Sequence, residues 1–171
     1  MSNPSTISRE LLTGLINQVN VKQWLENELV FAQPTPVVGQ DWNTAISVTA
    51  VEDQIYTGTV SVQYNRVNLA TIVGEDSTDF DLNGAYDNAT DLAPILVGRF
   101  GCLIDATDLV SAPLPAPDED GVVTVIIQAH PNSLLWRGQL SITLTPVVVP
   151  IDTLIATTEL DGFVLSNLLA N

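Results

Sequence analysis

The sequence predicts an α+β protein made of two similar tandem units, each a small antiparallel sheet with a helix. Three observations predict this class. Segments about 80 residues apart resemble each other, each unit opens with apolar residues at helical spacing, and apolar and polar residues then alternate as in half-buried strands. The units are expected to span residues 1–83 and 84–171 and to pack together.

The repeat rests on five pairs of matching segments, which keep the same order at shifts of 78 to 81 residues. Chance explains one or two such matches, because apolar alternation beside a glycine is common in β proteins. Five in register favour an internal duplication. The pairs are Leu11–Asn20 with Leu92–Gly101, Glu28–Ala32 with Asp108–Ala112, Val48–Ala50 with Ile127–Ala129, Tyr56–Val62 with Trp136–Ile142, and Leu82–Gly84 with Leu160–Gly162.

The first unit is predicted to open with a helix. Six apolar residues between Ile7 and Val19 recur at helical spacing. Ser5 or Thr6 can cap the start of this helix, and Asn20 can end it.

The second unit is predicted to open in the same way, with a helix over Leu92–Phe100. Gly101 follows the last apolar residue and can close the helix. Pro94 then lies in the first turn, where proline is tolerated because the first N–H groups of a helix have no intrahelical acceptor.

Two strands are predicted after a proline-rich link in each unit. Apolar residues alternate with polar ones in these strands, which indicates one buried and one solvated face. The links are expected to be extended, solvated chain, so their prolines are candidate interface residues. The strands are Ile46–Ala50, Val60–Tyr64, Val123–Ile127 and Leu140–Leu144, and the link prolines are Pro34, Pro36, Pro113 and Pro115.

Composition narrows the function classes. The chain has 20 acidic and 5 basic residues, a net charge of −15, and is 46% hydrophobic, which is too apolar for an acidic disordered chain. The five cations are scattered, so nucleic acid is not expected as a partner. A membrane span is not expected either, because no apolar run is long enough, and the start lacks the pattern of a signal peptide.

One segment has the spacing of a calcium-binding loop. Asp79, Asp81, Asn83 and Asp87 stand at loop positions 1, 3, 5 and 9, and Gly84 stands at position 6. The bidentate acid expected at position 12 is missing, because that residue is a threonine. An acidic hairpin turn at the Asn-Gly pair is the alternative, and it is favoured over a calcium site. No other cofactor is expected.

Residues for catalysis are scarce, and no enzyme is predicted. His130, the only histidine, stands beside a proline in a predicted turn, which indicates a surface loop. Cys102, the only cysteine, lies in an apolar stretch and is expected to be buried and inert. Arg66 is expected either to pair with a carboxylate, within the subunit or across an interface, or to lie exposed at a strand end.

The segment Ser47–Ile72 resembles a recurring module in virion structural proteins of large myovirus-like tailed bacteriophages; its sequence is SVTAVEDQIYTGTVSVQYNRVNLATI. Leu11–Asn20 and the LDGF segment Leu160–Phe163 fit the same module. The resemblance implies a particle component and carries no catalytic residues.

The function expected from these observations is a non-enzymatic building block of a tailed-phage virion, made and assembled in the host bacterial cytoplasm. Its expected partners are copies of itself and other virion proteins. Arg66, the link prolines and the tail residues Leu168 and Leu169 are the candidate interface residues. The alternative is a calcium- or carbohydrate-binding adhesion module on a host-facing tail part, and a small hydrolase ranks last.

Overall fold

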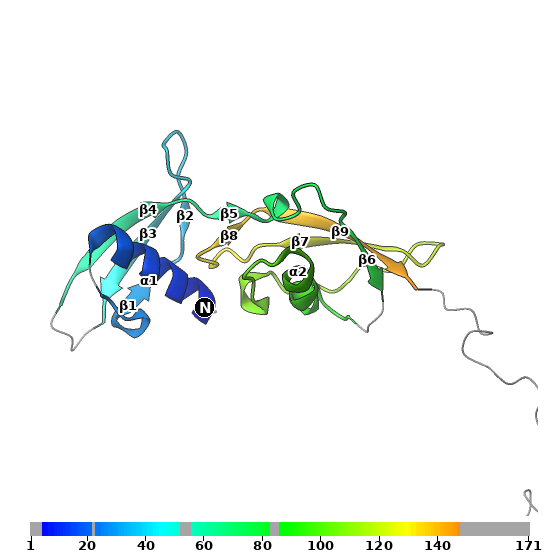
Figure 1. The fold of residues 1–171 in the computed structure, drawn as a ribbon, viewed down its shortest axis with the longest axis horizontal. Coiled ribbons are helices and arrows are strands. Elements are labelled where there is room, and N and C mark those ends of the chain that lie inside the picture. The colour runs from blue at the N-terminus through cyan, green and yellow to red at the C-terminus, as the bar shows by residue number, and fades with distance from the viewer. Residues whose placement is uncertain (1–4, 22, 52–55, 83–85, 148–171) are drawn as a thin grey trace, which may run out of the picture.

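The computed structural model describes residues 5–21, 23–51, 56–82 and 86–147. It confirms the α+β class, with two α-helices and small sheets set along an elongated molecule (Figure 1). The α-helices are α1 (Thr6–Asn20) and α2 (Ala93–Phe100). The strands are β1 (Leu29–Phe31), β2 (Thr35–Pro36), β3 (Thr44–Ala50), β4 (Thr59–Tyr64), β5 (Val67–Asn68), β6 (Asp79–Leu82), β7 (Val123–Gln128), β8 (Trp136–Arg137) and β9 (Gln139–Pro146). Four 3₁₀ helices are η1 (Glu26–Glu28), η2 (Leu69–Thr71), η3 (Ala89–Leu92) and η4 (Ala106–Asp108).

Both helices begin and end close to where the sequence predicts. The Ser5 hydroxyl accepts a 3.1 Å hydrogen bond from the Ser8 amide and caps α1. Val21, rather than Asn20, takes the left-handed conformation that ends α1, with φ of 53°. Gly101 ends α2 at φ of 62°, where a glycine avoids the steric penalty that a side chain would incur.

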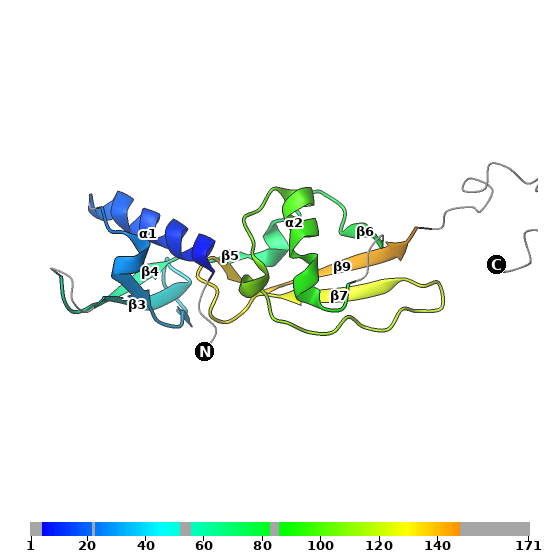
Figure 2. The same cartoon turned by 90° about the horizontal axis from the view of Figure 1, so that it is seen from below.

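Each half of the molecule has its own sheet. In the first, β3 is central, with β4 on one side and β1 and β2 on the other, all antiparallel. In the second, β9 is central, with β7 antiparallel on one side and β6 parallel on the other. The short β5 and β8 pair in parallel between the two halves (Figures 1 and 2).

The strand registers of the two sheets are related by the shifts of the sequence repeat. In the first sheet Val48 faces Val60, and in the second Ile127 faces Leu140. A shift of 79 on the first strand and of 80 on the second converts one pair into the other. The pair Leu29↔Ala50 likewise becomes Leu109↔Ala129. The duplication stays a proposal, and the shared register supports it.

The chain changes from one core to the other earlier than the proposed boundary at 83/84. Leu69 and Phe80 are buried in the core of the second half, together with α2 and the inward faces of β7 and β9. Conversely, Leu134 from the second half is fully buried in the first core, beside Leu12 and Tyr64. Packing therefore interlocks the halves, because each inserts apolar residues into the other.

A buried carboxylate also joins the halves. The side chain of Asp108, at the end of η4, is fully buried and accepts hydrogen bonds from three serine hydroxyls. Ser5 and Ser8 come from the start of α1, at 2.9 and 2.8 Å, and Ser133 comes from the β7–β8 connection, at 2.7 Å. These bonds compensate the loss of hydration at the carboxylate and fix the start of α1 on the second half.

Candidate assembly surface

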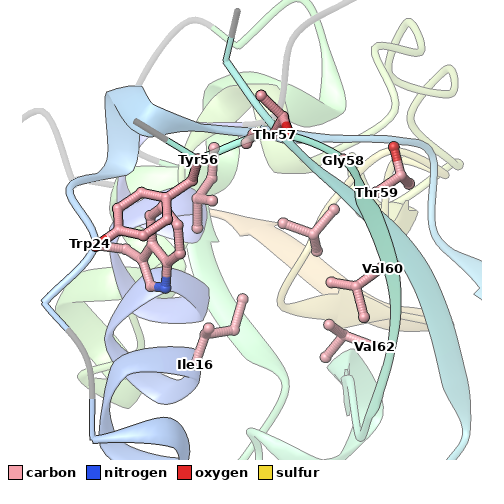
Figure 3. Close-up of a pocket in the computed structure, with 11 residues that line it drawn as sticks. Ile16, Trp24, Tyr56, Thr57, Gly58, Thr59, Val60 and Val62 are labelled. Carbon is pink, nitrogen blue, oxygen red and sulfur yellow. The ribbon is translucent and has the colours of Figure 1, made fainter. Parts of the chain in front are cut away.

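The first half carries an open apolar groove between α1 and the sheet. Its volume is about 340 Å³. Figure 3 shows Val60 and Val62 of β4 along one side, Ile16 of α1 on the opposite side, and Trp24 and Tyr56 at one end. The other lining residues are Leu29, Val48, Ala50, Thr57, Gly58 and Thr59.

The aromatic end of the groove is held in place. The rings of Trp24 and Tyr56 meet edge to face, with centroids 4.5 Å apart. The side chain of Asn17, on α1, binds the backbone of Trp24 twice: its Oδ1 accepts from the amide at 2.7 Å and its Nδ2 donates to the carbonyl at 2.8 Å. The groove is therefore a formed feature of the fold.

The corresponding positions in the second half are covered. Val60 is 59% exposed, whereas Leu140, 80 residues later, is 5% exposed. Tyr56 is 52% exposed, whereas Trp136 is 6% exposed and donates its indole N–H to a backbone carbonyl at 3.0 Å. The two sheets have the same register, so the difference lies in what covers them.

Part of the cover in the second half comes from the stretch Val67–Leu82, called here the exit segment of the first half. The rest comes from η3, α2 and the chain that follows α2. The exit segment contains β5, η2 and β6, and it follows directly after β4. Its residues Leu69 and Phe80 enter the second core, and β6 pairs with the edge of β9. Within the described residues, β4 pairs with β3 alone, so its other edge is open.

The open edge of β4 lacks the usual protection against pairing. Its sequence, Thr-Val-Ser-Val-Gln-Tyr, contains no charged residue and no proline, the features by which natural proteins keep edge strands apart. Exposed apolar residues also concentrate in this half. Of the fifteen large hydrophobic residues that are exposed in the described chain, ten precede Arg66.

Three buried polar atoms have no hydrogen-bond partner among the described residues, and all lie in the first half. They are Thr13 Oγ1, Glu26 Oε2 and the hydroxyl of Tyr64. Burial raises the pKa of Tyr64 to about 12, and the charge of Arg66 opposes the shift. Unpaired buried polar groups are uncommon in folded proteins.

Arg66 lies at the junction between the halves, and among the described residues its guanidinium binds neutral partners and no carboxylate. Its Nε donates to the Thr44 hydroxyl at 3.1 Å. Its Nη1 donates to backbone carbonyls of Pro131, Ser133 and Trp136, at 3.4, 3.2 and 3.4 Å. Burial lowers the pKa of its guanidinium. The residue therefore joins the two halves of one chain.

The other predicted interface residues have mixed surroundings. In the first link Pro34 is buried, whereas Pro36 is exposed on the short strand β2, which pairs with β3. Pro113 and Pro115 are exposed, and Pro113 forms a bridge with Asn88. Leu168 and Leu169 lie outside the described residues.

The candidate calcium loop is extended in its first part. Asp79 and Asp81 lie on β6, which pairs in parallel with β9 and not with a strand just after the Asn-Gly pair. Asn83 is outside the described residues, and the amide of Asp87 donates to the Asp91 carboxylate at 3.0 Å. Among the described residues, no group of three or more His, Cys, Asp or Glu side chains is placed to hold a metal ion.

The two candidate reactive residues lie apart from the groove. His130 is half-buried in the turn after β7, and its Nδ1 accepts from the amide of Asn132 at 3.1 Å. Cys102 is half-buried after α2, where burial raises the pKa of its thiol. In the described part of the chain, neither helix has the length and apolarity needed to cross a bilayer.

Sequence reasoning missed the groove and two buried residues that join the halves. The repeat aligns Val60 with Leu140. The groove shows itself only in the different exposure of these two residues, which the sequence does not give. Sequence reasoning also left Asp108 and Leu134 without a role. The only local signal for Asp108 is its place in the matching segment that starts at Glu28.

The fold and the groove define the chain as an α+β protein with an open, apolar sheet edge. The chain belongs to the family of unknown function DUF7941, whose family model matches residues 1–167. No curated protein and no solved structure matches the chain.

Proposed function

We propose that the chain is a non-enzymatic structural subunit of a tailed-phage particle, which joins neighbouring polypeptides through the groove and the open edge of β4. The observation that carries this proposal is the uncovered apolar face of β4, with Val60 59% exposed where its counterpart Leu140 is 5% exposed. Such a surface gains free energy when a partner removes it from water and pairs with its backbone.

The chemistry of the groove favours a polypeptide over a small polar ligand. Its described lining residues are aliphatic, aromatic or threonine, with one glycine, and none carries a carboxylate, amide or guanidinium group. Recognition of a nucleotide or metabolite relies on such groups to fix orientation. A strand with apolar side chains can bind here through hydrogen bonds to the backbone edge of β4 and apolar contacts with the groove.

The resemblance of Ser47–Ile72 to phage virion proteins is the reason for proposing a phage particle as the assembly. The net charge of −15 keeps free subunits soluble in the host cytoplasm before assembly. The same charge opposes contact with packaged DNA, so an outer position in the particle is favoured.

Site-specific cross-linking tests the proposal. A photo-reactive amino acid at Val60 should cross-link the chain to another particle polypeptide in purified virions, and the same group at Ile126, exposed on β7, serves as the matched control. Absence of the chain from purified particles would contradict a virion role. Presence of the chain without preferential cross-links at Val60 would contradict the use of this surface.

The Trp24–Tyr56 pair favours a second candidate, a carbohydrate-binding adhesion module, because sugar rings stack on exposed aromatic faces. This candidate predicts glycan binding by the isolated chain that is lost in Tyr56→Ala. No binding on a glycan array would remove it.

A further inference from the structure

We infer that the groove and β4 edge of one copy are completed by residues 147–160 of a second copy, so that chains join head to tail. This inference rests on the proposed function and names the partner of the same surface. It follows from the way in which the exit segment of the first half already completes the second half within one chain.

The template for this contact is visible in the described structure. After β4, the exit segment places Val67 beside Trp136 in a parallel pair. It then buries Leu69 completely and places Phe80 beside Leu144 on the edge of β9. One half therefore donates two short strands and an apolar plug to the next half along the chain.

Applying the shift of the repeat to these contacts predicts equivalent contacts for the C-terminal residues. A shift of 80 converts the pair Val67↔Trp136 into Val147 beside Tyr56. Leu69, which shares the second core with Leu140, becomes Val149, and the side chain of Val149 would enter the groove that Val60 lines. The open face of the first half thus has a counterpart donor in the sequence, and that donor follows β9 as the exit segment follows β4.

The sequence of the donor fits this role. Residues 147–151 read Val-Val-Val-Pro-Ile, and the matching Leu-Asp-Gly and Leu-Asn-Gly segments end both donors, at a shift of 78. The amide of Ala70 in η2 donates to Asn68 Oδ1 at 3.2 Å. In residues 147–160 the corresponding residues are Pro150 for Ala70 and Val148 for Asn68. The N–H group and the side chain that accepts from it are therefore lost together.

The direction of the chain favours a second copy over the same copy. β9 ends at the far end of the elongated described structure from α1 and β4 (Figures 1 and 2). In addition, the exit segment passes from one half to the next half along the molecule, and by the repeat the segment after β9 requires a further half, which a second copy supplies. A head-to-tail contact of this kind builds rings or filaments, because the two surfaces that meet are different.

Two full-length variants isolate the two surfaces. Val60→Lys blocks the groove and leaves the donor intact, whereas Val149→Lys blocks the donor and leaves the groove intact. Ile126→Lys places the same charge on an exposed residue of β7, outside the groove, and is the control. Circular dichroism and the melting temperature check that each variant is folded, which is expected because Val60 is exposed.

Light scattering coupled to size exclusion reads the result. We expect the wild-type mass to rise with concentration above the 18.3 kDa of one chain, and Ile126→Lys to follow it. Each blocked variant alone should stay monomeric, and their mixture should give a species of two chains, since one copy supplies the donor and the other the groove.

Three outcomes would overturn the inference. A wild-type chain that stays monomeric at all concentrations would exclude a second copy as the occupant. Assembly that survives Val149→Lys but not Val60→Lys would keep the surface of the proposed function and reject this donor. Assembly that survives both variants would reject the groove as the contact between copies, whereas the surface assigned under the proposed function is tested separately by the cross-links at Val60 in particles.

Discussion

The hydroxyl of Ser8, on α1, donates a 2.8 Å hydrogen bond to Oδ1 of Asp108, which stands 100 residues further along the chain. Both side chains are fully buried. The bond fixes the first helix to the second half of the molecule, so the two halves are expected to unfold in one cooperative transition.

Replacing Asp108 with asparagine should lower the free energy of unfolding by about 2–4 kcal/mol, because an amide cannot accept from three hydroxyls as the carboxylate does. Chemical denaturation measures the loss. Asp120→Asn, an exposed residue of a turn, is the matched control and should change stability by less than about 0.5 kcal/mol. Equal effects of the two substitutions would show that the buried cluster does not hold the halves together.

Leu134→Ala should destabilise the first half although the residue belongs to the second. Leu134 is fully buried in the first core, and truncation of such a leucine costs about 2–5 kcal/mol through lost burial and the cavity left behind. Leu103→Ala, at a residue that is 54% exposed, is the control. Hydrogen exchange should report faster opening of β3 in Leu134→Ala, and unchanged exchange there would refute the interlocked packing.

Tyr64→Phe should cost less than about 1 kcal/mol at neutral pH, because the buried hydroxyl has no partner among the described residues. The same substitution should flatten the alkaline stability curve. The pKa of Tyr64 is about 12 in the folded state against an ordinary value of 10.0. Between these values the unfolded state loses the proton first, so stability falls as pH rises, by at most about 1.4 kcal/mol per pH unit.

The matched substitution Tyr56→Phe, at a residue that is 52% exposed, shows what the loss of a tyrosine hydroxyl does to stability away from the core. A wild-type stability that does not fall more steeply than that of Tyr64→Phe between pH 10 and 12 would mean that Tyr64 titrates normally.

Calcium is expected to leave the melting temperature unchanged within about 1 °C, and so is a chelator. Asp79 and Asp81 lie on β6, and an extended strand cannot wrap around an ion as a calcium loop does. Differential scanning fluorimetry with and without millimolar calcium measures this. A rise of many degrees would instead support the calcium-binding adhesion module.

Local patterns predicted much of this fold because they report directly on burial and backbone geometry. Alternation in Val123–Ile127 indicated a strand, and β7 buries its alternate residues. Ser5 and Gly101 marked helix ends through their hydrogen-bonding and conformational preferences. The repeat predicted which segments of the two halves correspond.

The same patterns could not predict which segments lie side by side when they are distant in sequence. The Asn83-Gly84 pair indicated a hairpin, whereas β6 ends just before it and pairs in parallel with β9. The alternation around Val60 shows which face of the strand is apolar, but it does not show which segment covers that face. Leu134 packs with Tyr64 and Leu12, and Asp108 binds Ser8, which stands 100 residues earlier, so no local spacing identifies these partners.

The most direct test of the assembly surface is amide hydrogen exchange of β4, Thr59–Tyr64, in dilute and in concentrated wild-type protein. Completion of the first half by a second copy predicts that the β4 amides facing away from β3 exchange rapidly in dilute protein and become protected in concentrated protein. Val60→Lys should stay unprotected at both concentrations. Exchange of these amides that is the same at every concentration would contradict an edge completed by a second chain.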